Sequence, residues 1–183
     1  MPRISTFQTI ADAPESAQPL LEQAQKQLGA LPNIFRTIAN SPAALQGYLA
    51  VSGALGKGTL PAATRERLAL AIAQVNGCGY CLSAHTYFGK NAAKLDDAEI
   101  TANRNGASND PFADAAVRFA VKIARERGHV SEADVQAVKD AGYTDAQLVE
   151  IVQHVAVNSF TNYFNEVFQT AIDFPVVDLR EAA

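Results

Sequence analysis

The sequence predicts an all-α fold, and three observations support this prediction. First, no segment sustains the period-two alternation of apolar and polar residues that is typical of a half-buried strand. Second, apolar residues recur at helical spacing, as Leu68, Ile72 and Val75 do at i, i+4 and i+7. Third, such segments begin at capping residues and end at glycines, as between Ser131 and Gly142.

The first 58 residues predict a helical N-terminal extension that packs on the core. After an extended arm of 12 residues, a helix is expected over residues 14–28, where Gly29 ends it. A short helical turn follows Pro32-Asn33. Ser41-Pro42 then supplies an N-cap and a proline at the first position of a helix that reaches about Leu55. Three glycines before residue 59 separate this part from the core, residues 59–183, and the two together are expected to form one compact domain.

The core is predicted to consist of helices that are separated by glycine-containing breaks. One helix begins at Pro61, and Asn76-Gly77 separates it from a second helix that begins at about Cys78. Asp110-Pro111 opens another helix. The remaining expected boundaries are a stop at Gly128, a helix from Ser131 to Gly142, and a long final helix from the capping box Thr144-Asp-Ala-Gln147 to about Ile172.

Both cysteines of the chain lie close to one of its three histidines. Cys78, Cys81 and His85 follow one another at spacings of three and four, so they share one face of the helix. Glu66 lies roughly 15 Å before the break and His85 roughly 10 Å after it, at 1.5 Å per residue. If the two helices fold back antiparallel, Glu66 and His85 meet across the hairpin.

A Cys-x-x-Cys pair in a chain of this length indicates redox or metal chemistry in a reducing compartment. Haem attachment is excluded because it needs a histidine directly after the second cysteine, where this chain has Leu82. A zinc site remains an alternative, with the two cysteines, His85 and Glu66 as its four ligands. A thioredoxin-like pair is disfavoured because the flanking segments are helical.

The residues support a reactive thiolate but leave open which cysteine carries it. Cys78 lies at a helix N-terminus, where the backbone dipoles favour negative charge. His85, one turn beyond Cys81, favours Cys81 instead, because it can accept the proton of that thiol. Glu66 would orient the imidazole and stabilise its cationic form. The alternative for Glu66 is a solvated acid in the first turns of its helix.

These motifs resemble the alkylhydroperoxidase D (AhpD)-like branch of the carboxymuconolactone decarboxylase superfamily. The resemblance consists of a Glu, a Cys-x-x-Cys twelve residues later and a His four residues after that pair. It extends to Leu28–Phe35 with Ser41-Pro42, and to Asn158–Asn165. It implies an all-helical AhpD-like bundle with the Cys-x-x-Cys motif at the start of a core helix, assembled as a homo-oligomer, either a trimer or a hexamer.

The resemblance also implies an activity, which is thiol-dependent reduction of hydroperoxides without a metal or any other cofactor. Cys81 would attack the peroxide, Cys78 would resolve the product, and Glu66 and His85 would relay protons. Tyr80 departs from the best-known member's pattern, which has a second histidine there, so a shorter relay or a different substrate is expected. The decarboxylase branch lacks the cysteine pair, which argues against lactone decarboxylation.

Composition restricts the partners. A net charge of -4 gives no electrostatic footprint for nucleic acid. Without a recognisable signal peptide or membrane span, the expected location is the cytoplasm. The expected partners are a hydroperoxide, a dithiol reductant protein or small thiol, and further copies of the chain, since 48% of the residues are hydrophobic. A non-catalytic redox-sensing or disulfide-exchange protein is the alternative function.

The final helix carries polar residues in register. His154, Asn158, Asn162 and Asn165 recur at i, i+4, i+8 and i+11, beside phenylalanines. We interpret this stripe as a hydrogen-bonded helix contact that lines a subunit interface or the approach to the active site, and we do not expect its amides to act in catalysis.

Overall fold

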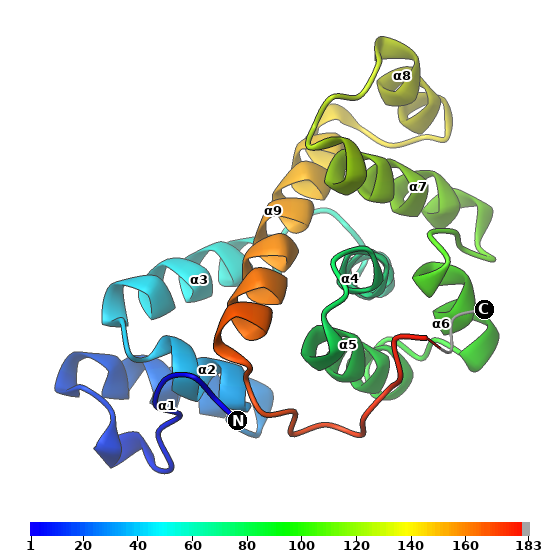
Figure 1. The fold of residues 1–183 in the computed structure, drawn as a ribbon. Coiled ribbons are helices and arrows are strands. Elements are labelled where there is room, and N and C mark those ends of the chain that lie inside the picture. Colours follow the sequence, from blue (N-terminus) through cyan, green and yellow to red (C-terminus); the bar gives the residue numbers. More distant parts are fainter. Residues whose placement is uncertain (181–183) are drawn as a thin grey trace.

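The computed structural model describes residues 1–180, and in that range it is built from helices without any strand (Figure 1). Two short 3-10 turns, Ile10–Asp12 and Glu15–Ala17, precede the first α-helix. The α-helices are α1 (Gln18–Leu28), α2 (Asn33–Ile38), α3 (Pro42–Leu55), α4 (Ala62–Val75), α5 (Gly79–Asn91), α6 (Asp97–Arg104), α7 (Pro111–Glu126), α8 (Glu132–Asp140) and α9 (Asp145–Phe168).

Helix α4 lies at the centre of the bundle and packs against α5, α6, α7 and α9 (Figure 1). Its residues from Leu68 to Ala73 are all buried, so this helix is apolar around most of its circumference. Small side chains at Ala69, Ala71 and Ala73 allow neighbouring helices to approach closely. The helix that carries Glu66 is therefore held from several sides.

Two apolar clusters meet at α4. The first joins Leu70 to the N-terminal helices, through Leu21 and Leu45, and to Leu82 of α5. The second joins Ile72 to α7, α8 and α9. Burial of apolar surface is worth roughly 25 cal/mol per Å². The N-terminal helices share the first of these cores with α4 and α5.

The helices expected from the sequence are present, with three differences. The first helix, expected over residues 14–28, is α-helical only from Gln18, after the 3-10 turn Glu15–Ala17. Helix α6 was not predicted, although the side chain of Asp96 caps it by accepting a hydrogen bond from the Glu99 backbone N–H. The final helix ends at Phe168 and not at about Ile172, because Gln169 takes the left-handed conformation with φ 52°. The chain beyond it runs as an irregular tail that passes α5 (Figure 1).

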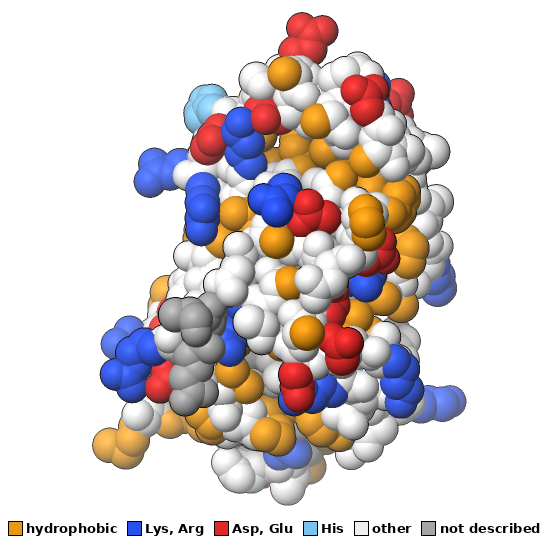
Figure 2. All heavy atoms as spheres, turned by 90° about the vertical axis from the view of Figure 1, so that its right-hand side faces the viewer, with side chains coloured by type: hydrophobic (Ala, Val, Ile, Leu, Met, Phe, Trp, Pro, Cys, Tyr) orange, Lys and Arg blue, Asp and Glu red, His pale blue; other side chains and the backbone are white. Residues whose placement is uncertain are grey.

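Exposed side chains on the face shown in Figure 2 include both acidic and basic residues, interspersed with neutral and hydrophobic ones. Among residues 1–180, no helix combines the length and the apolar character needed to cross a bilayer.

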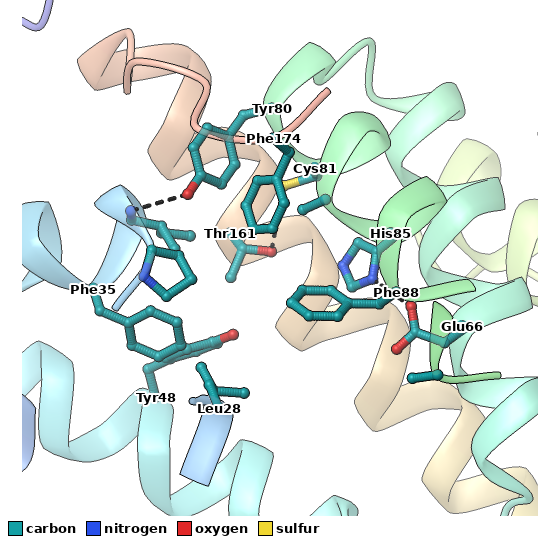
Figure 3. Close-up of a pocket in the computed structure, with 14 residues that line it drawn as sticks. Leu28, Phe35, Tyr48, Glu66, Tyr80, Cys81, His85, Phe88, Thr161 and Phe174 are labelled. Carbon is teal, nitrogen blue, oxygen red and sulfur yellow. Dashed lines mark hydrogen bonds and ion pairs between the residues drawn. The ribbon is translucent and has the colours of Figure 1, made fainter. Parts of the chain in front are cut away.

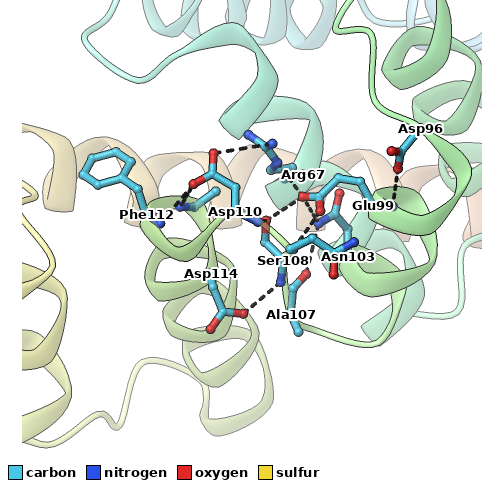
Figure 4. A network of polar contacts seen from close by, with 11 residues as sticks. Arg67, Asp96, Glu99, Asn103, Ala107, Ser108, Asp110, Phe112 and Asp114 are labelled. Atoms are coloured by element: carbon cyan, nitrogen blue, oxygen red, sulfur yellow. Dashed lines mark hydrogen bonds and ion pairs between the residues drawn. The ribbon is translucent and has the colours of Figure 1, made fainter.

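A buried carboxylate joins α4, α6 and the start of α7 (Figure 4). Glu99 accepts hydrogen bonds from Arg67 Nε at 2.6 Å, Asn103 Nδ2 at 3.0 Å, Ser108 Oγ at 2.5 Å and the Asn109 backbone N–H at 2.7 Å. Burial opposes ionisation of Glu99, but these donors outweigh it and lower the pKa of the carboxyl group.

We expect Glu99→Ala to lower the free energy of unfolding by about 3 kcal/mol at pH 7, because it removes an acceptor of the buried Asn103 amide and leaves Arg67, whose side chain is 13% exposed, with its 3.6 Å contact to Asp110. Urea unfolding measures the loss. The control is Asp97→Ala in the same helix, whose side chain is 82% exposed in its ion pair with Lys90 and should cost less than about 1 kcal/mol.

The pH dependence is a second test of the same group. A carboxyl group whose folded-state pKa is lowered stabilises the fold above its ordinary pKa, and this stability is lost as the pH falls through the folded-state value. The difference in free energy of unfolding between wild type and Glu99→Ala should therefore become smaller at acidic pH. If Glu99→Ala and Asp97→Ala lowered the free energy of unfolding equally at pH 7, the structural role given to Glu99 would be contradicted.

Candidate active site

The break between α4 and α5 creates the site. Gly77 has a φ of 67°, a left-handed conformation that glycine adopts without steric cost, and the Cys78 backbone N–H donates to the Ala73 carbonyl at 2.9 Å. Cys78 then caps α5, because its Sγ accepts a hydrogen bond from the Cys81 backbone N–H at 3.4 Å. The turn lays α5 back along α4, as the helical spacing predicted.

Glu66 and His85 meet across this hairpin (Figure 3). Glu66 Oε2 lies 2.9 Å from His85 Nδ1, and each side chain is 24% exposed. Burial lowers the pKa of His85, but the charge and hydrogen bond of Glu66, together with the charge of Cys81, raise it above the ordinary value. The pair therefore favours an imidazolium beside the cysteines, and Glu66 is not a solvated surface acid.

The two cysteines are both free thiols and both buried. A hydrogen bond from Cys78 lowers the pKa of Cys81, burial opposes it, and the charge of His85 adds to the lowering, giving a value of about 6. The same hydrogen bond and burial raise the pKa of Cys78. The dipole of α5, which favoured a thiolate at Cys78, is outweighed because Cys78 shares its proton with Cys81.

Helix α9 closes the site from behind. Asn165 Nδ2 donates a hydrogen bond to Cys81 Sγ at 3.2 Å, and Thr161 Oγ1 lies 3.9 Å from the same sulfur. Asn162 accepts a hydrogen bond from Asn76 Nδ2 at 2.8 Å, which ties α9 to the α4–α5 turn. The polar stripe is thus a buried contact, as interpreted, but Asn165 and Thr161 touch the sulfur itself.

Those two contacts were not predicted. The i, i+4, i+8, i+11 register of amides on α9 was the available signal, since a buried amide needs a polar partner and Cys81 is the polar group opposite.

A pocket of about 280 Å³ opens onto Cys81 (Figure 3). Most of its wall is aromatic or aliphatic, and its polar groups are few. The apolar residues labelled in Figure 3 are Leu28, Phe35, Tyr48, Tyr80, Phe88 and Phe174. Leu28, Phe35 and Tyr48 come from the N-terminal helices, and Phe174 comes from the tail after α9.

A second, smaller pocket of about 160 Å³ lies on the other side of Glu66 and His85. Arg65, Ser52 and His154 line it, so it is more polar than the first. His154 is 7% exposed, its Nε2 has no hydrogen-bond partner among residues 1–180, and burial lowers its pKa to about 4. The imidazole of His154 is therefore neutral at neutral pH.

The hydroxyl group of Tyr80 forms hydrogen bonds within the fold. Its Oη donates a hydrogen bond to Asp173 at 2.8 Å and accepts one from the Ile34 backbone N–H at 3.2 Å. Burial raises the pKa of this hydroxyl. Tyr80 thus links the tail to α2 and forms part of the pocket wall, while Glu66 and His85 form their pair without it.

Within residues 1–180, no three side chains among His, Cys, Asp and Glu are arranged to hold a metal ion.

Comparison with known proteins supports the fold. Residues 42–126 match the model of the carboxymuconolactone decarboxylase family, a range that includes Glu66, both cysteines and His85. No curated protein sequence matches the chain significantly.

Several solved structures share the fold. The AhpD core of an uncharacterised peroxidase-related protein from Ralstonia eutropha JMP134 is 24% identical, with a TM-score of 0.83 over 94% of this chain and 92% of that one. A peroxidase-related protein from Silicibacter sp. TM1040 is 23% identical, with a TM-score of 0.80 over 93% and 91%. A Cys-to-Ala variant of the debrominase Bmp8, in complex with 2,3,4-tribromopyrrole, is 18% identical, with a TM-score of 0.78 over 94% of each chain.

The geometry predicts an order of thiol reactivity. At pH 7 a limiting amount of iodoacetamide should alkylate Cys81 and leave Cys78 largely unmodified, because only Cys81 has a lowered pKa. Peptide mass mapping against pH should give a midpoint near 6 for Cys81.

Asn165→Leu provides a matched test, since it removes the hydrogen bond to Cys81 Sγ but keeps a side chain of similar size. The pH midpoint for alkylation of Cys81 should therefore rise in this variant. Preferential alkylation of Cys78 in wild type would contradict the electrostatic assignment.

Proposed function

We propose that the chain, whose residues 42–126 match the carboxymuconolactone decarboxylase family and whose fold is that of an AhpD core, is a thiol-dependent peroxidase that reduces organic hydroperoxides. The observation that carries this proposal is the set of contacts around Cys81. A thiol with a pKa of about 6 opens onto an apolar pocket, beside a resolving thiol and a carboxylate–imidazole pair. Such an arrangement favours attack by sulfur on a polarised bond.

The proposed cycle begins with the Cys81 thiolate. It attacks the terminal oxygen of the hydroperoxide, the O–O bond breaks, and the alcohol leaves with a proton that His85 donates. Cys81 is then a sulfenic acid, which condenses with the Cys78 thiol to form a disulfide and release water. An external dithiol, either a reductant protein or a small thiol, restores both cysteines. We place this cycle in the cytoplasm, where such reductants keep thiols reduced.

Glu66 has a positioning role in this scheme. Its carboxylate holds Nδ1 of His85, which fixes the ring and favours the protonated form. The more polar second pocket borders the same pair, and we propose that water reaches the imidazole from that pocket. The alcohol product and the replacement proton would then use different openings.

The pocket also favours a class of substrate. Aromatic rings surround the space above Cys81, and few polar groups compensate for the burial of a polar substrate. We therefore propose an alkyl or aryl hydroperoxide with an apolar carbon skeleton in preference to hydrogen peroxide.

Reductive dehalogenation is a second candidate. The debrominase Bmp8 shares the fold, and its Cys-to-Ala variant is in complex with 2,3,4-tribromopyrrole. In such a reaction the two thiols would supply two electrons, a proton would replace bromine on the ring, and bromide would leave as the disulfide forms. The apolar pocket beside a thiolate suits a halogenated ring as well as a hydroperoxide. Non-catalytic redox sensing is the third possibility.

The decisive experiment follows oxidation of the reduced protein. An organic hydroperoxide such as cumene hydroperoxide should oxidise it far faster than a free thiol of the same pKa, and faster than hydrogen peroxide does, because the pocket binds the apolar skeleton. Mass spectrometry should show the loss of two hydrogens as the Cys78–Cys81 disulfide forms.

Steady-state turnover with a dithiol donor separates an enzyme from a sensor. Release of bromide from a brominated pyrrole, without hydroperoxide turnover, would favour the second candidate. A dithiol that survives excess hydroperoxide would refute the peroxidase proposal.

Glu66→Gln tests the positioning role, because it keeps the shape of the side chain and removes its charge. The pKa of His85 should fall, the pKa of Cys81 should rise, and hydroperoxide turnover should drop by roughly 10²-fold, within the range typical of acid–base assistance. Turnover and alkylation rates against pH provide the measurement. His85→Gln should have at least as large an effect, whereas Glu126→Gln, at an exposed carboxylate in α7, should have none. If Glu66→Gln changed neither the pH dependence of Cys81 alkylation nor the hydroperoxide turnover, Glu66 would have no role in the site, which would then consist of the cysteines and His85.

A further inference from the structure

A continuous apolar stripe runs along the outer side of α9. Its members are Val149, Val152, Ala156, Phe160, Tyr163 and Val167. Ala156 is exposed, and the other five side chains are between 40% and 70% exposed. Successive members are three or four residues apart, so they lie on one side of the helix, as in a helix seam that packs against another helix. No member of the stripe is charged.

Helix α3 extends this uncharged surface. It packs beside α9 (Figure 1) and has no charged residue between Pro42 and Leu55, although Leu45 and Leu55 are its only buried residues. A surface helix of a monomer normally carries charged side chains on its solvent side. The two helices border a groove of about 280 Å³, whose wall includes the small residues Ala44, Gly47 and Ala156.

We propose that this surface binds a second copy of the same chain, with α9 packed antiparallel against α9 of the partner about a two-fold axis. The axis passes close to residue 158, the middle of the stripe. In this register Val149 lies opposite the partner's Val167, Val152 opposite the partner's Tyr163, and Ala156 opposite the partner's Phe160.

The stripe is complementary to a second copy of itself when the two helices are antiparallel, but not when they are parallel. Its aromatic side chains lie in the second half of α9, so antiparallel pairing sets Ala156 against the partner's Phe160 and Val152 against the partner's Tyr163, while the valines at the two ends pack against each other. Parallel pairing would set aromatic rings against each other and leave a gap at the opposite end. The partner's Phe160 also meets the groove beside Ala156, which has room for a ring. Antiparallel helices further align their dipoles favourably.

The area available is adequate for a stable pair. A helix of 24 residues is roughly 36 Å long and about 11 Å wide, so α9 alone contributes roughly 800 Å² over both partners. A specific interface needs about 1,000 Å² in total. The uncharged surface of α3 supplies the remainder, since it flanks the same groove.

This pairing would support the apolar pocket, although it does not depend on the peroxidase proposal. The ring of Phe160 lies 6.0 Å from that of Tyr48, which lies 5.8 Å from Phe35, and the latter two line the pocket above Cys81. A two-fold contact requires an even number of subunits. It is therefore compatible with a hexamer and incompatible with an isolated trimer.

Sedimentation equilibrium at micromolar concentration tests the assembly. The wild type should have an even multiple of the 19.5 kDa chain mass, and Ala156→Glu, which places a charge at the centre of the seam, should halve it. Val176→Glu is the control, because Val176 is 75% exposed but lies outside the stripe. A mass of one or three chains in wild type, or an unchanged mass in Ala156→Glu, would overturn the proposal. Circular dichroism verifies that each variant keeps its helix content.

Cross-linking tests the register without a destabilising change. In a background with both native cysteines replaced by serine, Val149→Cys mixed with Val167→Cys should cross-link through a short bismaleimide, and neither variant should cross-link alone. Cross-linking of each variant with itself would show parallel pairing. The absence of any cross-link in the mixture would also contradict the antiparallel pair.

Discussion

The contact between Glu66 and His85 is the constraint on which the rest of the site depends. It joins residues nineteen positions apart, from two helices that meet only because the three-residue break 76–78 reverses the chain. A longer break would shift α5 along α4 and separate the carboxylate from the imidazole. The apolar packing of α4 on both sides holds this register, so stability of the core and protonation of the histidine have a common origin.

Helix α9 contributes the second part of the environment of Cys81. A thiolate that is buried without donors would be protonated, because desolvation opposes the charged form. The amide of Asn165 and the thiol of Cys78 donate hydrogen bonds to the sulfur, and the charge of His85 adds to their effect, so that together they counter this cost. The pocket wall can then be apolar without raising the pKa of the thiol, which permits an apolar substrate and an anionic nucleophile in one cavity.

Local patterns in the sequence were sufficient for most of the helices and for the Glu66–His85 pair, because helical spacing and a glycine break determine both. They did not identify Asn165 as a partner of Cys81 or Asp173 as a partner of Tyr80, since those pairs are separated by 84 and 93 residues and depend on how distant helices pack. Helix α6 has eight residues, too few for a sustained helical periodicity of apolar side chains. The end of α9 at Phe168 depends on one left-handed residue, Gln169, which is not a glycine.

The lowered pKa of Cys81 links the redox state of the chain to its resistance to unfolding. The Cys81 thiol, with an ordinary pKa of 9.0 in the unfolded chain and about 6 in the folded one, adds no stability below pH 6 and an increasing amount between those values. Above pH 9 the raised pKa of Cys78 opposes this contribution, because the unfolded chain ionises that thiol more readily than the folded one. A disulfide has no proton to lose, so oxidation removes this pH-dependent contribution. The reduced and oxidised forms must then follow different curves of stability against pH, and each catalytic turnover would move the protein between them.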